Sequence, residues 1–254
     1  MRYAIIRRVS PALADCELTF MGRSPIDFAR ADQQHRQIGQ WLESHGVTLI
    51  TLPPDPKLPD STFTEDIAIV LDEMAIITNP GAPSRRNETI AVAEILAHFR
   101  PLHFIKPPGT IEGGDVVRIG RSIYVGLGSR TNAEGIRQLS SITQPDGYEV
   151  IPIPFRHALH LKTCATWLGD QTWLVNPDWL QIPLPGNYRL LNVPAAEPWA
   201  ANTLLLDGKV HLPAAHPQTA RMLRNSGYQV ATIAMDELQK AEAGLTCLSI
   251  IFEA

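Results

Sequence analysis

A unit that recurs along the chain constrains its fold more than any other feature of the sequence. In each unit a polar residue stands just ahead of a short apolar run, and in most units a second apolar run follows a tight turn. These polar residues recur every 40 to 50 positions. They are Asp66, Glu112, His160, Asn202 and Cys247. Five units of one kind at a regular period indicate a cyclic repeat architecture, in which each unit buries its apolar face against the next.

Within a unit, the pattern predicts a hairpin, a helix and one more strand. The first hairpin joins apolar runs at 67–71 and 74–78, and a helix at about 87–99 and a strand at 102–105 follow it. The segment from Thr131 to Glu134 has the form of a capping box, with Thr131 as the N-cap. The other hairpins are expected at 116–125, 164–175 and 203–212, and the other strands at 148–153, 188–193 and 228–233, with a helix at 217–226.

The two ends of the chain are expected to close the ring. The apolar run after Cys247 has no second strand of its own, and an N-terminal strand at Tyr3–Ile6 can supply it. Ser24 is the expected N-cap of a helix that runs to about His45, and a strand at 47–52 follows. Equivalent loops would then face one end of a central channel and bring two carboxylates, an imidazole, an amide and a thiol together. The alternative is a set of unrelated α+β elements.

Composition narrows the classes of partner. A chain of 254 residues with 44% hydrophobic residues suits one domain over 1–254, and a net charge of -4 favours a small molecule over nucleic acid or a membrane surface. Neither a spanning apolar stretch nor a signal-peptide pattern is present, so we expect a cytoplasmic protein. Cys16, Cys164 and Cys247 are far apart and form no CxxC pair. We therefore expect no disulfide framework, no metal and no organic cofactor.

A cysteine and a histidine beside several carboxylates suit the hydrolysis of a guanidinium group. Carboxylates favour a bound cation, and the planar fork of a guanidinium matches carboxylate oxygens. Attack of the Cys247 sulfur on the central carbon and loss of an amine would leave a covalent S-linked amidino intermediate, which water would hydrolyse to a urea. His160 would protonate the departing amine and then deprotonate the water. The bound cation would also lower the pKa of the thiol.

Each candidate also has a purely structural explanation. Free cysteines are often small buried hydrophobes, and the glycine pair at 113–114 is common turn material. Acidic loop residues such as Asp60 and Glu65 are usually solvated. Arg85 and Arg130 lie near helix starts, where cations are electrostatically unfavourable, which favours a ligand role such as holding a substrate carboxylate.

Six groups of residues in this chain occur in the order of one known family. They are Pro59–Ser61 with Glu65 and Asp66, Pro80–Ala82 with Ser84–Arg86, Glu112–Asp115, Ser129–Gly135, His160–Thr163 and the late Cys247. Over nearly its whole length the chain resembles the dimethylarginine dimethylaminohydrolases, the dimethylargininase branch of the guanidine-modifying penteins. The resemblance implies a five-bladed α/β propeller. It also implies hydrolysis of N-methylated L-arginines to citrulline plus dimethylamine or methylamine.

The same resemblance implies a role for each matching residue. Cys247 would be the nucleophile, His160 the general acid and base, and Glu112 the carboxylate that supports the histidine. The implied substrate-binding residues are Leu18 on a lid, Asp66 on the guanidinium with Asp60 and Glu65 shaping that end, Arg85 and Arg130 on the α-carboxylate, and Thr246 beside the nucleophile.

One position separates branches of the superfamily. Arginine deiminases have an aspartate two residues after the histidine, whereas this chain has Lys162, which leaves room for methyl groups. Thr246 stands where a serine is expected, which bears on substrate fit rather than on chemistry. The alternatives are an arginine deiminase or related amidino hydrolase and, from another class, a catalytically silent scaffold that binds a protein partner. The sequence leaves the preferred methylation state and the oligomeric state open, a homodimer included.

Overall fold

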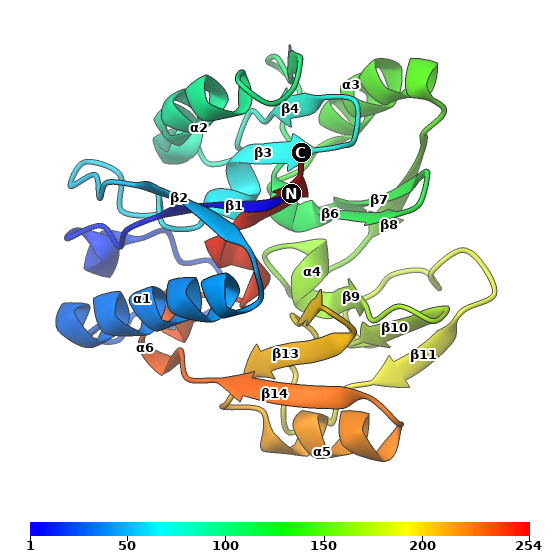
Figure 1. Ribbon diagram of the computed structural model, residues 1–254. Coiled ribbons are helices and arrows are strands. Elements are labelled where there is room, and N and C mark those ends of the chain that lie inside the picture. The colour runs from blue at the N-terminus through cyan, green and yellow to red at the C-terminus, as the bar shows by residue number, and fades with distance from the viewer.

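Five three-stranded sheets surround a central axis in the computed structural model, which describes all 254 residues (Figure 1). In each sheet, the middle strand is antiparallel to the first strand and parallel to the third, in the order in which the strands are given below. This is the predicted cyclic repeat, an α/β propeller. The sheets are β15 (Ile250–Glu253), β1 (Arg2–Arg7) and β2 (Thr48–Leu52); β3 (Ala68–Val70), β4 (Ala75–Ile77) and β5 (Leu102–Phe104); β6 (Val116–Ile119), β7 (Ser122–Leu127) and β8 (Glu149–Pro154); β9 (Ala165–Trp167), β10 (Thr172–Val175) and β11 (Arg189–Asn192); and β12 (Leu204–Leu206), β13 (Lys209–Pro213) and β14 (Gln229–Ile233).

Helices join the middle strand to the third strand in four of the sheets and lie on the outside of the ring (Figure 1). They are α1 (Phe28–Ser44), α2 (Thr89–Leu96), α3 (Ala133–Thr143) and α5 (Pro217–Asn225). The sheet of β9, β10 and β11 has no helix at this position. Two short helices, α4 (Leu161–Cys164) and α6 (Asp236–Gln239), complete the set. None of these helices combines the length and the apolar character that crossing a membrane requires.

Two helices begin at different caps from those predicted. Asp27, rather than Ser24, caps α1 by accepting the N–H three residues on at 3.1 Å. Asn132, rather than Thr131, caps α3 in the same way at 2.8 Å. Thr131 instead donates its hydroxyl to Asp115 at 2.6 Å. Because these side chains cap comparably well, the tertiary partner of Thr131 decides where the helix begins.

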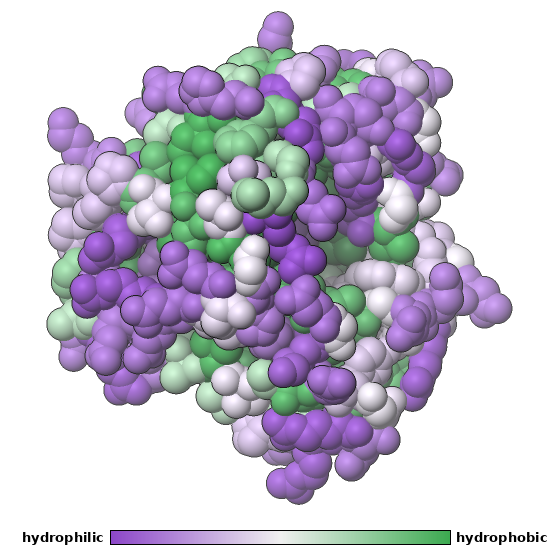
Figure 2. All heavy atoms as spheres, in the orientation of Figure 1, coloured by the Kyte–Doolittle hydropathy of each residue, from purple (hydrophilic) through white to green (hydrophobic).

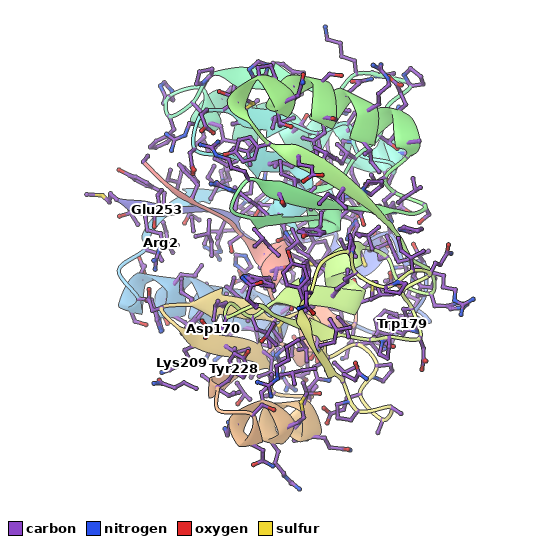
Figure 3. The ribbon with its side chains drawn as sticks, turned by 90° about the vertical axis from the view of Figure 1, so that its right-hand side faces the viewer. Arg2, Asp170, Trp179, Lys209, Tyr228 and Glu253 are labelled. Carbon is purple, nitrogen blue, oxygen red and sulfur yellow. The ribbon has the colours of Figure 1, made fainter.

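The ring closes where the two ends of the chain meet, as predicted. β1 pairs antiparallel with β15, with Arg2 opposite Glu253 and Ile5 opposite Ile250. The side chains of Arg2 and Glu253 are neighbours in Figure 3, and Nε of the arginine lies 4.0 Å from Oε1 of the glutamate. The N-terminal ammonium also donates to the carbonyl oxygen of Ala254. The first sheet therefore needs both ends of the chain.

The hydrophobic core is divided into clusters between neighbouring sheets. One cluster joins Ile76 of β4 to Ile123 of β7, and the next joins Tyr124 of β7 to Trp173 of β10. A middle strand can contribute to two clusters because successive side chains point to opposite faces. Hydrophilic residues cover most of the face in Figure 2, with hydrophobic ones visible between them. Burial against both neighbours holds each sheet in its place in the ring.

Short helical turns precede the first strands and carry the site. The turn η2 (Thr64–Ile67) packs against both η4 (Gly113–Asp115) and η6 (Thr246–Leu248), and α4 packs against η4. The predicted 87–99 helix is divided into the end of a 3-10 turn, η3 (Pro83–Glu88), and the shorter α2. Asp66 lies on η2 (Thr64–Ile67), Glu112 directly precedes η4 (Gly113–Asp115), His160 directly precedes α4, and Cys247 lies on η6 (Thr246–Leu248); the other turns are η1 (Leu13–Asp15), η3 (Pro83–Glu88) and η5 (Gln144–Asp146). Equivalent positions of the repeat thus meet at one end of the channel.

Candidate active site

The thiol of Cys247 lies at the start of the last strand and is half-buried. Its sulfur accepts a hydrogen bond from the N–H of Gly244 at 3.4 Å. Burial raises the pKa of the Cys247 thiol, and the carboxylates of Glu65 and Asp66 raise it further. This sulfur is therefore protonated at neutral pH. A bound cation would oppose those carboxylates and make the thiolate accessible.

The imidazole of His160 lies between two carboxylates. Its Nε2 is 2.6 Å from Oε2 of Glu112, and its Nδ1 is 3.7 Å from Oδ1 of Asp66. Burial alone lowers the pKa of His160, but the charge of Asp66 and the bond to Glu112 outweigh burial and raise it to about 9. Burial raises the pKa of Glu112, and the bond to His160 and neighbouring cations reverse this and leave it lowered. The pair is therefore an ion pair with an imidazolium at neutral pH.

Asp66 lies between the guanidinium of Arg85 and the imidazole of His160. Its Oδ2 accepts from Nη1 of Arg85 at 2.6 Å, and its Oδ1 accepts from the N–H of Gly114 at 3.1 Å. Only 2% of its surface is exposed. Buried between N–H donors, this group suits the binding of a substrate cation.

Arg85 is held on several sides. Its Nε and Nη2 contact the carboxylate of Glu88, and Nη2 also donates to the carbonyl oxygen of Phe63 at 3.0 Å. Burial lowers the pKa of Arg85, and the carboxylates of Glu88 and Asp66 reverse this and raise it well above its usual value. Nη1 makes a single hydrogen bond. Its second N–H is the one that remains for a substrate carboxylate.

Arg130 and Glu112 form the other side of the site. Nη1 of the arginine lies 3.3 Å from Oε1 of the glutamate, and that oxygen also accepts from the N–H of Gly81 at 2.9 Å. A Cβ built on Gly81 would lie 2.5 Å from the carbonyl oxygen of Arg130. This glycine therefore lets the two segments approach closely enough for the contact.

Glu65 and Lys162 lie on a different side from the cation site. Nζ of the lysine is 2.5 Å from Oε1 of Glu65, and Thr246 donates to Oε2 at 2.6 Å. Asn202 in turn donates to the Thr246 hydroxyl at 3.0 Å and accepts its N–H at 3.1 Å. The amide of the fourth repeat thus fixes the residue before Cys247. Both hydroxyl partners of Thr246 are protein groups.

The segment around Leu18 lies beside the site, and Glu17 lines the same pocket as Cys247. Leu18 and Cys247 pack against the same apolar cluster. Both Oδ atoms of Asp60 lie 3.2 Å from the N–H of Glu17, so this buried carboxylate anchors the segment rather than contacting the other acids. On the far side, Oε1 of Glu242 accepts the N–H groups of residues 19, 20 and 21 at 2.9, 2.6 and 2.6 Å. We call residues 17–21 the lid.

The glycine pair after Glu112 is a requirement of the site, not only a turn. A Cβ on Gly114 would lie 2.6 Å from Nδ1 of His160 and 2.7 Å from Oδ1 of Asp66. A Cβ on Gly113 would lie 1.9 Å from the carbonyl oxygen of residue 65. All three distances are shorter than a real Cβ contact, so these positions need glycine for the acidic and basic side chains to meet.

The predicted residues divide between two cavities. One pocket is lined by Asp60, Asp66, Arg85, Arg130, His160 and Cys247. Glu65 and Thr246 line a larger cavity, about 370 Å³, with Lys162 and with β3, β6, β9, β12 and β15. Glu112 lies fully buried behind the histidine, and Leu18 belongs to the lid. The structure therefore brings Cys247, His160 and Asp66 together in one pocket, and Glu65 and Thr246 line the other.

Three acidic residues of the site were not predicted from the sequence. Asp115 is fully buried, accepts the N–H of Leu161 at 2.8 Å and thereby holds the start of α4 beside His160. Glu88 holds Arg85, and Glu242 holds the lid. For Glu88 a signal existed, because a glutamate three residues after an arginine in a helical turn lies on the same face. Asp115 and Glu242 act on segments distant in sequence and left no such signal.

Asp66, Glu112 and His160 offer ligand atoms that lie within 4.8 Å of one another, the arrangement of a metal-binding set. Their oxygens, however, already accept hydrogen bonds from Arg85, Gly81 and other N–H donors. Such a set fits an acid, a base and an organic cation better than it fits a metal ion.

Comparisons with known proteins show similarity to one family. The family described as N,N dimethylarginine dimethylhydrolase, eukaryotic, matches residues 23–183. The N(G),N(G)-dimethylarginine dimethylaminohydrolase of Pseudomonas aeruginosa is 34% identical over 99% of both chains, and that of Streptomyces coelicolor is 38% identical over 97% of this chain and 95% of its own.

Solved structures extend the comparison. The Pseudomonas aeruginosa enzyme, as a cysteine-to-serine mutant complexed with citrulline, superimposes with a TM-score of 0.93 over 98% of both chains at 33% identity. The N-terminal domain of ArgZ, a cyanobacterial arginine dihydrolase, has a TM-score of 0.86 over 99% of this chain and 98% of its own at 17% identity. The second similarity is one of fold alone.

Proposed function

The chain belongs to the dimethylarginine dimethylaminohydrolase family of the pentein superfamily, and on that premise we propose that it hydrolyses N-omega-methylated L-arginines to L-citrulline and dimethylamine or methylamine. The observation that carries this proposal is the single pocket lined by Cys247, His160 and Asp66. A nucleophile, an acid and an anionic cation site are the three groups that this reaction needs. The enzyme is a cysteine-dependent hydrolase that acts on a small molecule.

Substrate binding prepares the nucleophile. We assign Asp66 to the guanidinium, and Arg130 with the free N–H of Arg85 to the α-carboxylate, because all three line the pocket. Leu18 on the lid would cover the substrate, and Asp60 would hold that lid. The bound guanidinium lowers the pKa of the thiol, whose proton leaves to solvent.

Bond changes then follow in two halves. The Cys247 thiolate attacks the guanidinium carbon and forms a neutral tetrahedral adduct, and the imidazolium of His160 protonates the methylated nitrogen. The C–N bond breaks and the methylamine departs, which leaves an S-linked thiouronium cation. Neutral His160 then takes a proton from water, and the oxygen adds to the same carbon. Collapse expels the thiolate and, after loss of a proton, gives citrulline. Glu112 keeps the imidazole ring in place throughout.

Preference for a methylated substrate is part of the proposal. Lys162 points to Glu65 and contributes no carboxylate that would grip unsubstituted guanidinium nitrogens. Thr246 has both of its hydroxyl bonds within the protein, so its methyl group is what affects substrate fit. We further propose that residues 1–254 act as one domain in the cytoplasm without a cofactor, with homodimer formation left to measurement.

The test is citrulline formation from asymmetric dimethylarginine, monomethylarginine and arginine by the native protein and by Cys247→Ser. We expect citrulline from the methylated substrates only, and none from the variant. Preferential turnover of arginine would instead identify a deiminase and refute the argument from Lys162. If none of the three compounds is turned over, and Cys247→Ser still binds a protein partner, the catalytically silent scaffold would be favoured.

A further inference from the structure

Glu88 is a buried carboxylate whose side-chain hydrogen bonds are all with one residue. Its Oε2 accepts from Nη2 of Arg85 at 2.9 Å, and both of its oxygens lie 3.2 Å from Nε. Only 1% of Glu88 and 2% of Arg85 are exposed. No step of the proposed mechanism uses Glu88. That mechanism therefore gives no role to the contact between Glu88 and Arg85.

The two carboxylates around Arg85 occupy different edges of the guanidinium. Asp66 contacts Nη1 at 2.6 Å, whereas Glu88 occupies the edge formed by Nε and Nη2. One positive charge is therefore shared by two negative ones. With Glu88 ionised the three groups carry a net charge of about -1, and with Glu88 neutral they carry about zero.

This difference matters at Asp66. A carboxylate that is fully neutralised by its own arginine attracts a second cation weakly, whereas one whose arginine is shared keeps negative charge for a ligand. Little solvent screening is available because all three side chains are buried. Ionisation of Glu88 therefore changes how strongly Asp66 attracts the substrate cation and the imidazolium of His160.

We propose that Glu88 is a positioning residue: it holds Arg85 by the edge that Asp66 does not use and takes up part of its charge, so that Asp66 remains anionic toward the substrate guanidinium. This inference rests on the proposed function, because it assumes that the ligand of Asp66 is a guanidinium cation. The contact with Glu88 also explains the orientation of Arg85, because it leaves the second N–H of Nη1 for the substrate carboxylate.

A pH dependence of binding follows from the same contacts. The charged groups that face Glu88 are Arg85 on its own turn, Arg7 on β1, and Asp60 and Asp66 from the preceding segment. Burial raises the pKa of Glu88 to about 7, although Arg85 opposes that rise. Glu88 is therefore ionised above about pH 7 and neutral below it, so the site binds a cation more strongly at pH 8 than at pH 6.

The test measures binding of asymmetric dimethylarginine by calorimetry to Cys247→Ser, in which the thiol does not titrate, with and without Glu88→Gln. At pH 8 we expect Glu88→Gln to weaken binding about tenfold. Between pH 8 and pH 6 the affinity should fall with Glu88 present and stay nearly constant with Glu88→Gln. Equal affinities at both pH values in the two proteins would overturn the inference.

A second readout needs no ligand. In Glu88→Gln the imidazole of His160 should have a lower pKa by NMR titration than in the native protein, since Asp66 would be more fully neutralised. An unchanged His160 pKa together with unchanged affinity means that Glu88 has only a structural role. Glu94→Gln, an exposed charge change on α2, is the matched control and should alter neither quantity.

The failure of this inference can be distinguished from failure of the proposed function. If asymmetric dimethylarginine does not bind Cys247→Ser at either pH, the substrate assignment is wrong and this inference falls with it. If it binds but Glu88→Gln matches its parent, only the inference is wrong. Should Glu88→Gln fail to fold, Glu88→Asp takes its place, and the shorter carboxylate should give an intermediate affinity; an affinity equal to that of its parent would overturn the inference.

Discussion

In the proposed mechanism, one of the two reacting groups already has the proton state that it needs at neutral pH, and the other does not. Burial and nearby carboxylates keep the Cys247 thiol protonated, and the charge of Asp66 with the bond to Glu112 keeps His160 protonated. The imidazolium is ready to act as an acid, whereas the thiol must first lose a proton. Ligand charge is therefore part of the catalytic mechanism and not only of recognition.

The resting thiol should consequently react slowly. We expect alkylation of Cys247 by iodoacetamide to be slow at pH 7 and to accelerate as pH rises, because the raised pKa leaves little thiolate. A guanidinium compound that binds without reacting should lower the pKa of the thiol. It should therefore accelerate alkylation of Cys247 wherever the sulfur stays accessible to iodoacetamide. Mass spectrometry of the modified peptide follows the rate, and rapid alkylation at pH 7 in the empty protein would contradict the assignment.

Turnover should fall on the alkaline side. His160 must be protonated to release the amine, and its pKa is raised to about 9. The turnover number kcat should therefore decrease as pH rises through about 9, when the imidazolium loses its proton. Measurement of kcat from pH 6 to 10 tests this, and a constant kcat up to pH 10 would show that another group is the acid.

Gly114 gives a test of the geometry at a single atom. Gly114→Ala would place a methyl group 2.6 Å from Nδ1 of His160, which must then move. A displacement of this size should reduce kcat about 100-fold. Gly46→Ala is the control, because its φ of 71° makes a side chain strained but its Cβ meets nothing. That variant should lose thermal stability and retain kcat, whereas normal kcat in Gly114→Ala would refute the crowding argument.

At the scale of elements, short segments connect the site to the rest of the fold. The lid is anchored by Asp60 on one side and by Glu242 on the other. One oxygen of Glu242 accepts three backbone N–H groups, while its Oε2 is buried without a partner. Such a contact holds a segment that has few apolar contacts of its own.

Loosening that contact should open the lid. In Glu242→Gln the acceptor loses its charge, so the three hydrogen bonds weaken. We expect faster amide hydrogen exchange at residues 19–21 and a several-fold higher KM, with kcat less affected. Exposed Glu43→Gln serves as the control. Unchanged exchange at these amides would mean that Asp60 and packing alone hold the lid.

For the whole molecule, ring closure is the dominant feature. The first sheet takes strands from both ends of the chain, and apolar clusters join each sheet to the next. No sheet has an independent core, so loss of one interface affects the ring as a whole. The site lies where all five repeats meet and depends on that closure.

Closure also predicts that the position of the termini is unimportant. Because β1 and β15 are adjacent and antiparallel, a short linker from Ala254 to Met1 should leave the first sheet intact. New ends between Gly186 and Asn187, in an exposed loop, should interrupt no strand. We expect this circular permutant to fold and to keep kcat within about threefold of the native value. Loss of cooperative unfolding, by calorimetry, would contradict this.

Much of the site could be predicted because it repeats. The period identified Asp66, Glu112, His160, Asn202 and Cys247, and four of these positions lie on or directly before the short helical turns that precede a first strand. The family motifs supplied roles for the remaining residues. Side-chain partners could not be predicted in this way. The contact of Glu242 with the lid joins positions more than 220 residues apart, and nothing local in either segment specifies it.

The sequence by itself determined the order of elements, the number of repeats and the residue types at the centre, because apolar periodicity and turn chemistry act over a few neighbouring residues. Only the tertiary structure decided how the charges pair. Whether Arg85 is shared by Asp66 and Glu88, and whether Lys162 turns toward Glu65, depends on distances of a few ångströms between segments of different repeats. Electrostatic energies change steeply over such distances, so charge pairing follows from the closed ring rather than from local sequence.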